Sequence, residues 1–301
     1  MMSLPFYLTD VFGGARYSGN QLATVFDGDG RLSGADMQRI AREINFSETS
    51  FITAREPVDG AFPVRIFTPR AEVEFAGHPT LGTAWLIRKH LLLDERVTEL
   101  ALDVKAGRVP VRFSGRHDRH GNELLWMRQI APVFGEALPM PWCADLLGLS
   151  PADLHTDWPA LQVSTGFPHL VIPVRTLAAL RRARIDLMLY RPWAENAWAK
   201  NILVFCPQAY EPGQTLAVRV FADYYGVAED AATGSGNGCL AAYLTHTGFA
   251  GADAIDISVG QGYELDRPSE LHLRARREGR AIEVEIGGAV IDVARGAWGG
   301  V

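Results

Sequence analysis

The strongest constraint on how this chain can fold is an internal repeat. The segment RIF at 65–67 is followed by a polar loop and by AGHPTLGTAWLI at 76–87, and RVF at 219–221 is followed in the same way by ATGSGNGCLAAYL at 232–244. The spacing from arginine to alanine is 76 − 65 = 11 residues in one copy and 232 − 219 = 13 in the other. Each copy predicts a strand, a polar loop, a glycine-rich turn and an apolar helix. A duplicated domain with two equivalent helix N-termini around one cleft is therefore expected; two unrelated strand–turn–helix units are the alternative.

Short strands dominate the rest of the pattern, which favours an α+β fold with mostly antiparallel sheet over a doubly wound parallel sheet. Few segments have helical spacing. Ser33 is a candidate N-cap for one of them, and Gly248 is a candidate C′ residue for another. The proline-rich segment 130–142 is the expected domain boundary. The expected helices are 36–42, 79–86, 177–184 and 238–246.

Composition excludes several classes of protein. The 301 residues are 48% apolar and 21% charged, which is typical of a globular chain and not of a disordered one. A net charge of −6 disfavours nucleic-acid binding. The three widely spaced cysteines argue against a disulfide framework and a cysteine zinc site. No signal peptide or membrane-spanning run is evident, so we expect a soluble, cytoplasmic protein.

The first candidate for chemistry is Glu48, within the run NFSETSF at 45–51. Its carboxylate lies between hydroxyl residues and two phenylalanines, where a helix is expected to give way to a strand. Apolar surroundings disfavour the charged form of a glutamate, so its pKa is expected to rise toward neutrality, as a general acid/base requires. The alternative is a surface turn in which Ser47 or Thr49 bonds to the backbone.

Two glycine-rich helix starts are the other candidates. In FAGHPTLG at 75–82, Gly77 lets a ligand approach the first-turn N–H groups, and His78 can donate a hydrogen bond or carry a proton. In EDAATGSGNG at 229–238, three glycines suit a carboxylate or phosphate cradle, and Asp230 can position a substrate amine or orient His78. An ordinary helix start and a flexible loop are the respective alternatives.

Weaker signals lie elsewhere. His117 and His120 can ligate a metal, but their charged, turn-like context favours a solvated hairpin. Trp193 and Trp198 can line an aromatic pocket or pack at an edge. The segment around Ser235 lacks the GxSxG pattern of a serine nucleophile, and it also lacks the Walker and dinucleotide-binding patterns.

Taken together, these motifs resemble the PhzF-like family of phenazine biosynthesis, within the diaminopimelate-epimerase-like fold. The resemblance extends over nearly the whole chain, in the order of the family. The motifs on which it rests are Gly19-Asn20 with LATVF, the SET run, IFTP at 66–69 with FAGHPTLG, EDAATGSGNGCLAAYL, Gln261-Gly262, Arg267-Pro268-Ser269 and Gly287-Gly288.

The resemblance implies two similar domains, 1–129 and 130–286, each with a curved sheet around a central helix, and a C-terminal strand at about 287–301 that returns to the first domain. It implies a homodimer, an interdomain active site, and no metal or organic cofactor. The implied reaction is a proton shift on a small cyclic carboxylate such as trans-2,3-dihydro-3-hydroxyanthranilate. Glu48 would be the catalytic acid/base, with His78 and Asp230 as its polar partners. The implied substrate-binding residues are Asn20, Gly77, Gly234 and Ser235.

Two departures from related patterns are visible. The two facing cysteines of diaminopimelate epimerase would fall at Ala76 and Thr233, so two-thiol chemistry has no acid/base pair here, and Cys239 is expected to be a packing residue. Ala231 stands where the family usually has proline, which predicts a looser loop beside Asp230. An epimerase or lyase acting on another small acid, and a non-catalytic binding module on the same scaffold, remain as alternatives.

Overall fold

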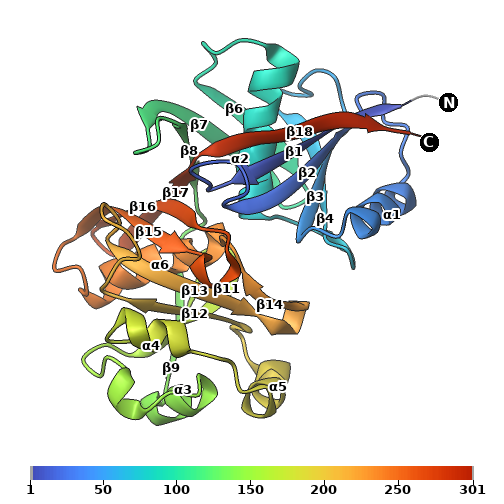
Figure 1. Ribbon diagram of the computed structural model, residues 1–301. Coiled ribbons are helices and arrows are strands. Elements are labelled where there is room, and N and C mark those ends of the chain that lie inside the picture. The colour runs from blue at the N-terminus through green and yellow to red at the C-terminus, as the bar shows by residue number, and fades with distance from the viewer. Residues whose placement is uncertain (1–2, 300–301) are drawn as a thin grey trace. The chain divides into compact units, whose positions relative to one another are not determined.

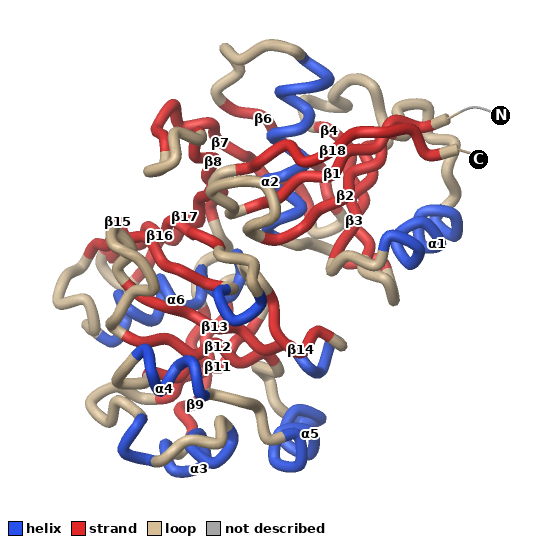
Figure 2. Tube along the Cα trace, viewed as in Figure 1, coloured by secondary structure: helices blue, strands red, loops and turns tan. Residues whose placement is uncertain are grey.

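Strands far outnumber helices in this protein, as Figure 2 shows. The structure is a computed structural model and describes residues 3–299. It divides into two compact units. Unit 1 contains the described residues up to Met127 together with those from Gly287 onward, and unit 2 contains Arg128–Ile286. The expected α+β class with mostly antiparallel sheet is confirmed.

Unit 1 is a sheet in which the last strand of the chain lies beside the first (Figure 1). β1 pairs antiparallel with both β18 and β2, β2 pairs parallel with β3, and β3 pairs antiparallel with β4. β4 then pairs antiparallel with β5 and parallel with β6, and β6 pairs antiparallel with β7. The strands are β1 (Leu4–Val11), β2 (Asn20–Phe26), β3 (Glu48–Ile52), β4 (Phe62–Phe67), β5 (Glu72–Val73), β6 (Glu99–Val104), β7 (Gly107–His117), β8 (Glu123–Arg128) and β18 (Val290–Trp298).

Unit 2 repeats this order of partners. β10 pairs antiparallel with β9 and β11, β11 pairs parallel with β12, and β12 pairs antiparallel with β13. β13 pairs antiparallel with β14 and parallel with β15, and β15 pairs antiparallel with β16. The strands are β9 (Val133–Leu138), β10 (Ala160–Ser164), β11 (Pro168–Pro173), β12 (Asn201–Cys206), β13 (Leu216–Ala222), β14 (Val227–Asp230), β15 (Ala254–Gln261), β16 (Ser269–Glu278) and β17 (Ala281–Gly288). Two unrelated units would not share such an order, so the internal repeat is a structural duplication.

Each unit has one central helix, α2 (Gly77–Leu86) or α6 (Gly234–Thr247), around which its strands curve (Figure 1). Every residue of α2 except Trp85 is buried, as expected for a helix that is apolar all round. Close packing explains Gly82, since a Cβ there would lie 2.5 Å from Cδ2 of Leu22 and 2.9 Å from Cγ2 of Val11. Both central helices continue the motifs of the repeat.

The outer face of each sheet is covered by other helices. In unit 1, α1 (Gly34–Ile44) packs Met37, Ile40 and Ala41 against sheet residues, and Ser33 caps it as predicted. In unit 2, an apolar cluster joins α3, α4 and α5 to the sheet. The remaining helical elements are α3 (Met140–Leu146), α4 (Leu177–Arg182), α5 (Leu187–Asn196), η1 (Ile87–Leu92), η2 (Pro151–Asp153), η3 (Asp223–Tyr225) and η4 (Tyr263–Leu265).

The elements differ in detail from those expected. α6 begins at Gly234, four residues before the expected start at 238, because its glycines pack within the helix instead of forming a loop. The two units divide at Met127 and Arg128, directly before the expected boundary segment 130–142, and that segment itself contains β9 and the start of α3. α5 was not expected, because Pro192 lies inside it. Within residues 3–299, no helix has both the length and the apolar character to cross a membrane.

Candidate active site

Glu48 is the first residue of β3, directly after the turn that ends α1. Asn45 ends that helix in the left-handed conformation with φ 58°, which turns the chain toward β3. β3 lies parallel to β2, with Glu48 opposite Leu22. The sequence placed Glu48 between a helix and a strand, and the structure locates it there.

Glu48 and His78 lie close together although 78 − 48 = 30 residues separate them. Oε2 of Glu48 is 3.6 Å from Nε2 of His78, and the histidine side chain is only 6% exposed. The glutamate side chain as a whole is 21% exposed, but Oε2 is buried and has no hydrogen-bond partner among the described residues. Burial raises the pKa of Glu48 to about 7, and a hydrogen bond from Ser47 opposes that rise only in part. The carboxyl is therefore poised to change protonation near neutral pH.

Asn20 belongs to the same cluster. It is the first residue of β2 and is 5% exposed. Its Oδ1 accepts a hydrogen bond of 3.4 Å from Oγ of Ser47, the residue that also bonds Glu48. Four predicted site residues, Asn20, Glu48, Gly77 and His78, thus lie in unit 1.

Gly77 and His78 open α2, whose N-cap residue is Ala76. Alanine has no side-chain acceptor, and no side-chain cap bond is made at this end of the helix. The first-turn N–H groups are therefore left to other acceptors, and the helix dipole favours an anion there. Because Gly77 has no side chain, an anion can approach this backbone closely.

The predicted residues of unit 2 form a separate cluster around Asp230, the last residue of β14. Its Oδ2 accepts a hydrogen bond of 2.6 Å from Oγ1 of Thr233. Its carbonyl accepts a bond of 2.8 Å from Nε2 of Gln261, which also donates to Thr233 Oγ1 at 3.0 Å. Asn237 donates to Gln261 Oε1 at 2.8 Å, so the network continues into α6.

Hydrogen bonds restrain the segment around Ala231, where the sequence predicts a looser loop. The carbonyl of Ala231 accepts a hydrogen bond of 2.9 Å from Oγ of Ser269. Asp230 is held on one side of Ala231 and Thr233 on the other by the amide of Gln261. Side-chain hydrogen bonds thus restrain this segment without the ring of a proline.

Gly234 and Ser235 are the first two residues of α6. Thr233 is the N-cap, but it makes no side-chain cap bond; its hydroxyl donates to Asp230 and accepts from Nε2 of Gln261. The first turn of α6 therefore resembles that of α2, with Gly234 buried and Ser235 half-buried. Both central helices present an N-terminus without a side-chain cap.

The duplication identifies which positions correspond. Ala76 and Thr233 are the two N-caps, where the epimerase resemblance expected the missing cysteines. In the sheets, Arg65 lies opposite Phe51 and Arg219 lies opposite Val204. Three residues before these partners come Glu48 and Asn201, so unit 2 carries an amide where unit 1 carries the acid.

Gln261 and Asn237 are site residues that the sequence did not predict with a role. Gln261 is fully buried and connects the end of β15 to the Asp230 segment. The Gln261-Gly262 motif was the available signal, but nothing local shows which backbone groups an amide will reach. Cys239 lies in α6, as expected for a packing residue; it is buried, and burial raises its pKa to about 12.

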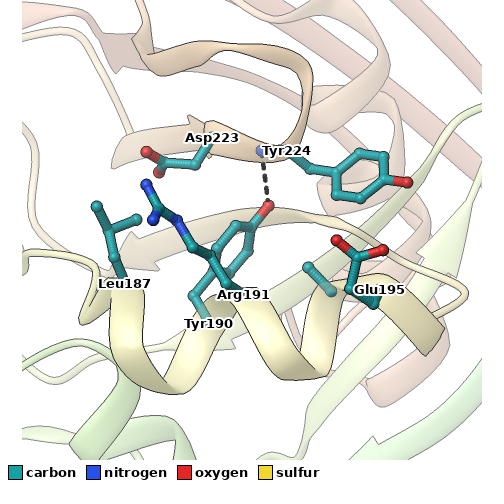
Figure 3. A pocket seen from close by; sticks show the side chains of 7 residues that line it. Leu187, Tyr190, Arg191, Glu195, Asp223 and Tyr224 are labelled. Atoms are coloured by element: carbon teal, nitrogen blue, oxygen red, sulfur yellow. Dashed lines mark hydrogen bonds between the residues drawn. The ribbon is translucent and has the colours of Figure 1, made fainter.

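A pocket of about 450 Å³ opens elsewhere in unit 2, between α5 and η3. In Figure 3 the carboxylate of Asp223 faces Arg191, and the Tyr190 hydroxyl accepts the backbone N–H of Tyr224 at 3.1 Å. None of the predicted site residues lines it. Trp193 packs against Trp142 at 5.3 Å between ring centres and does not line this pocket. The loop after His117 is the turn between β7 and β8, as a hairpin requires.

Comparison with known proteins agrees with the family resemblance of the sequence motifs. The model of the PhzC-PhzF family, described as phenazine biosynthesis-like protein, matches residues 9–296. A trans-2,3-dihydro-3-hydroxyanthranilate isomerase from Pseudomonas aeruginosa is 34% identical over 94% of this chain and 95% of its own.

Solved structures show the same fold. A phenazine biosynthesis protein of the PhzF family from Bacillus anthracis has a TM-score of 0.88 at 27% identity, covering 99% of both chains. A hydroxyproline epimerase from Agrobacterium vitis has a TM-score of 0.61 at 10% identity, covering 99% of this chain and 91% of its own, which shows likeness of fold alone.

Proposed function

Because this chain belongs to the phenazine biosynthesis-like family of isomerases, we propose that it is a cofactor-independent isomerase in which Glu48 moves a proton on a small cyclic carboxylate. The substrate class is represented by trans-2,3-dihydro-3-hydroxyanthranilate, on which the Pseudomonas aeruginosa relative acts by its name. The observation that carries the proposal is the carboxyl of Glu48, whose Oε2 is buried and lies 3.6 Å from Nε2 of His78.

A pKa of about 7 suits a group that must both accept and return a proton. In the forward step, the carboxylate takes a proton from a ring carbon of the substrate, and the electron pair of that C–H bond moves into the conjugated system. In the return step, the carboxylic acid gives the proton to another ring carbon. Atoms and charge balance without an added reactant, since the product is an isomer of the substrate.

The other predicted residues receive binding and proton-handling roles. His78 touches Glu48 and stabilises its carboxylate or hydrogen-bonds the substrate. Asp230 is proposed to hold the substrate amine. The substrate carboxylate is assigned to the N–H groups of Gly77 and Gly234 and to the Ser235 hydroxyl, with Asn20 as a further ligand.

The duplication supports a single acid/base over two facing bases. Unit 1 has Glu48, whereas the corresponding residue of unit 2 is Asn201, which cannot exchange a proton as a carboxyl does. The N-caps are alanine and threonine, so neither supplies a thiol. A lyase or one-base epimerase on another small acid is the alternative that this arrangement also allows.

The test is incubation with trans-2,3-dihydro-3-hydroxyanthranilate in D₂O, with ring protons followed by NMR. The wild type is expected to form the isomer, whereas Glu48→Gln, which keeps the shape but not the proton exchange, is expected to form none. Glu43→Gln, at an exposed glutamate of α1, is the matched control for the chemical change.

Each outcome has a defined meaning. Turnover by Glu48→Gln at the wild-type rate would refute Glu48 as the acid/base. A folded wild type that leaves this compound unchanged would refute the named substrate, and C–H exchange with other small acids would then decide between lyase and epimerase. Retention of the biological phenotype by Glu48→Gln would favour a binding module.

A homodimer in the cytoplasm completes the proposal. The dimer rests on the family resemblance, and the location rests on the three widely spaced cysteines, which suit a reducing compartment. Sedimentation velocity tests the dimer, and fractionation of the source cells tests the location. A single species of the 33.0 kDa chain mass would refute the dimer. Recovery of the protein outside the cytoplasmic fraction would refute the location.

A further inference from the structure

Each unit contains an arginine–glutamate pair with the same geometry. In unit 1, Nε and Nη2 of Arg65 donate to the two carboxylate oxygens of Glu72 at 2.7 and 2.8 Å. In unit 2, Nε and Nη2 of Arg219 donate to the two oxygens of Glu229 at 2.8 and 2.7 Å. Two parallel hydrogen bonds between planar groups define both distance and orientation. The repeat therefore includes a rigid side-chain pair as well as a strand order.

Both pairs lie at the same place relative to the central helix. Each glutamate is four residues before its N-cap, since 76 − 72 = 4 and 233 − 229 = 4. From arginine to glutamate the spacing is 72 − 65 = 7 in unit 1 and 229 − 219 = 10 in unit 2. The three additional residues correspond in number to η3, Asp223–Tyr225. An insertion between the partners has thus left the spacing from glutamate to helix unchanged.

The two pairs differ in the residue that comes after the glutamate. Val73 succeeds Glu72, whereas Asp230 succeeds Glu229. Neighbouring side chains of a strand point to opposite faces. Glu229 accordingly faces Arg219, and Asp230 faces the hydroxyl of Thr233 at the start of α6. Holding the glutamate on one face therefore restrains the aspartate on the other.

Arg219 is also held far more firmly than Arg65. Its side chain is 2% exposed, whereas that of Arg65 is 37% exposed. Nη1 of Arg219 donates to the carbonyls of Leu180 and Ala183, at 3.0 and 2.8 Å, at the end of α4. A second carboxylate, Glu264, lies 3.7 Å from its Nε.

Glu264 connects Arg219 to the other side of the Asp230 segment. It belongs to η4, Tyr263–Leu265, which begins two residues after Gln261. Its Oε2 also accepts a hydrogen bond of 2.8 Å from the hydroxyl of Tyr210. Arg219 thus contacts two glutamates. Glu229 directly precedes Asp230 in the sequence, and Glu264 lies close in sequence to Gln261, whose amide donates to the Asp230 carbonyl.

We infer that Arg219 is a positioning residue for the active site, which acts through Glu229 to fix Asp230, and that the half-buried Arg65–Glu72 pair is its structural counterpart without that role. The kinetic part of this inference rests on the proposed function of Asp230. Breaking the geometry of a buried, hydrogen-bonded charged pair costs more free energy than breaking that of a pair which water partly reaches and screens. Lysine keeps the charge of arginine but cannot make the two parallel bonds.

The first experiment compares Arg219→Lys with the matched variant Arg65→Lys by hydrogen exchange of backbone amides. Arg219→Lys is expected to speed exchange in peptides covering 227–236 by about tenfold, because the local opening free energy falls. Arg65→Lys is expected to give a smaller change, confined to peptides covering 72–80. This measurement needs no substrate. Wild-type exchange rates at 227–236 in a folded Arg219→Lys protein would overturn the inference.

The second experiment is a double-mutant cycle of Arg219→Lys with Asp230→Asn, measured as kcat and KM for the proton shift. If Arg219 acts through Asp230, Arg219→Lys lowers kcat by about tenfold in the wild-type background. In a protein that already carries Asp230→Asn, it lowers kcat little further. Equal effects in both backgrounds would overturn the inference. Should the wild type not turn over the test compound, the proposed substrate fails, and the exchange experiment still decides the role of Arg219.

Glu229→Gln covers the case in which Arg219→Lys does not fold. This variant keeps the shape of the side chain and leaves the bonds from Arg219 to the α4 carbonyls in place. It is expected to increase exchange at 227–236 in the same way, while exchange of α4 stays as in the wild type. Increased exchange in α4 without a change at 227–236 would assign Arg219 to the helix end alone.

Discussion

Replacing Glu48 by glutamine should change the pH dependence of stability in a direction that the structure defines. Burial raises the pKa of this carboxyl from 4.5 to about 7, so the folded protein retains a proton that the unfolded chain has lost between these values. Stability of the wild type therefore falls as the pH rises from 4.5 to 7 on account of this group. The difference of 7 − 4.5 = 2.5 units corresponds to about 3 kcal/mol at 1.36 kcal/mol per unit.

Glutamine has no proton to lose in this range. The free energy of unfolding of Glu48→Gln, relative to wild type, should therefore increase by about 3 kcal/mol between pH 4.5 and pH 8. Measured on the wild type without the variant, this trend is offset by the titration of His169. Burial lowers its pKa from 6.5 to about 4, so its contribution rises with pH across an overlapping window. Only the difference between variant and wild type isolates the carboxyl.

Urea unfolding followed by circular dichroism from pH 4.5 to 8.5 measures this difference. A ¹³C titration of the glutamate carboxyls, with Glu48→Gln to assign the signal, measures the pKa directly. Repeating the comparison with both proteins carrying His78→Gln removes the titratable neighbour of Glu48, which lies 3.6 Å away. A stability difference that stays constant or shrinks as the pH rises would refute the assignment of Glu48 to a desolvated site.

Further predictions concern the groups around the site and the central helices. Gln261→Ala should destabilise the protein by about 2–3 kcal/mol in urea unfolding, since it removes the acceptor of the Thr233 N–H and of one of the two Asn237 amide bonds, and the donor to the Asp230 carbonyl. The wild type should lose stability through His169 as the pH falls from 6.5 to about 4, and His169→Gln should abolish this loss. An equal fall in the free energy of unfolding of both proteins over this pH range would contradict the prediction. Gly82→Val should lower stability by about 1–3 kcal/mol through overpacking against Leu22, which a thermal melt can detect.

Local patterns in the chain predicted much of the fold. The apolar patterns at 65–67 and 219–221 identified β4 and β13, and Ser33 marked the start of α1 because a cap is a local contact. The two strand–loop–helix segments predicted the duplication, which the matching order of strand partners confirms. The family motifs identified the fold class and the isomerase family. Each of these signals depends on residues that are close together in the sequence.

The start of α6 shows where local patterns fail. Glycines normally interrupt helices, so the segment before Gly238 had the character of a loop. In the structure a Cβ at Gly236 would lie 3.1 Å from Nε2 of His169, and one at Gly238 would lie 2.7 Å from Oγ1 of Thr165. These residues belong to other elements, so only tertiary packing shows that the glycines lie inside a buried helix.

The chemistry divides in the same way. The sequence identified Glu48 and His78 as candidates, but their distance of 3.6 Å depends on how β3 and α2 pack within unit 1. The pKa of Glu48 follows from the water that this packing removes. Likewise, the pairing of Arg219 with Glu229 could be anticipated from neither residue, since it depends on the register of β13 and β14. Residue types and local periodicity are encoded along the chain, whereas desolvation and pairing arise between segments that only folding brings together.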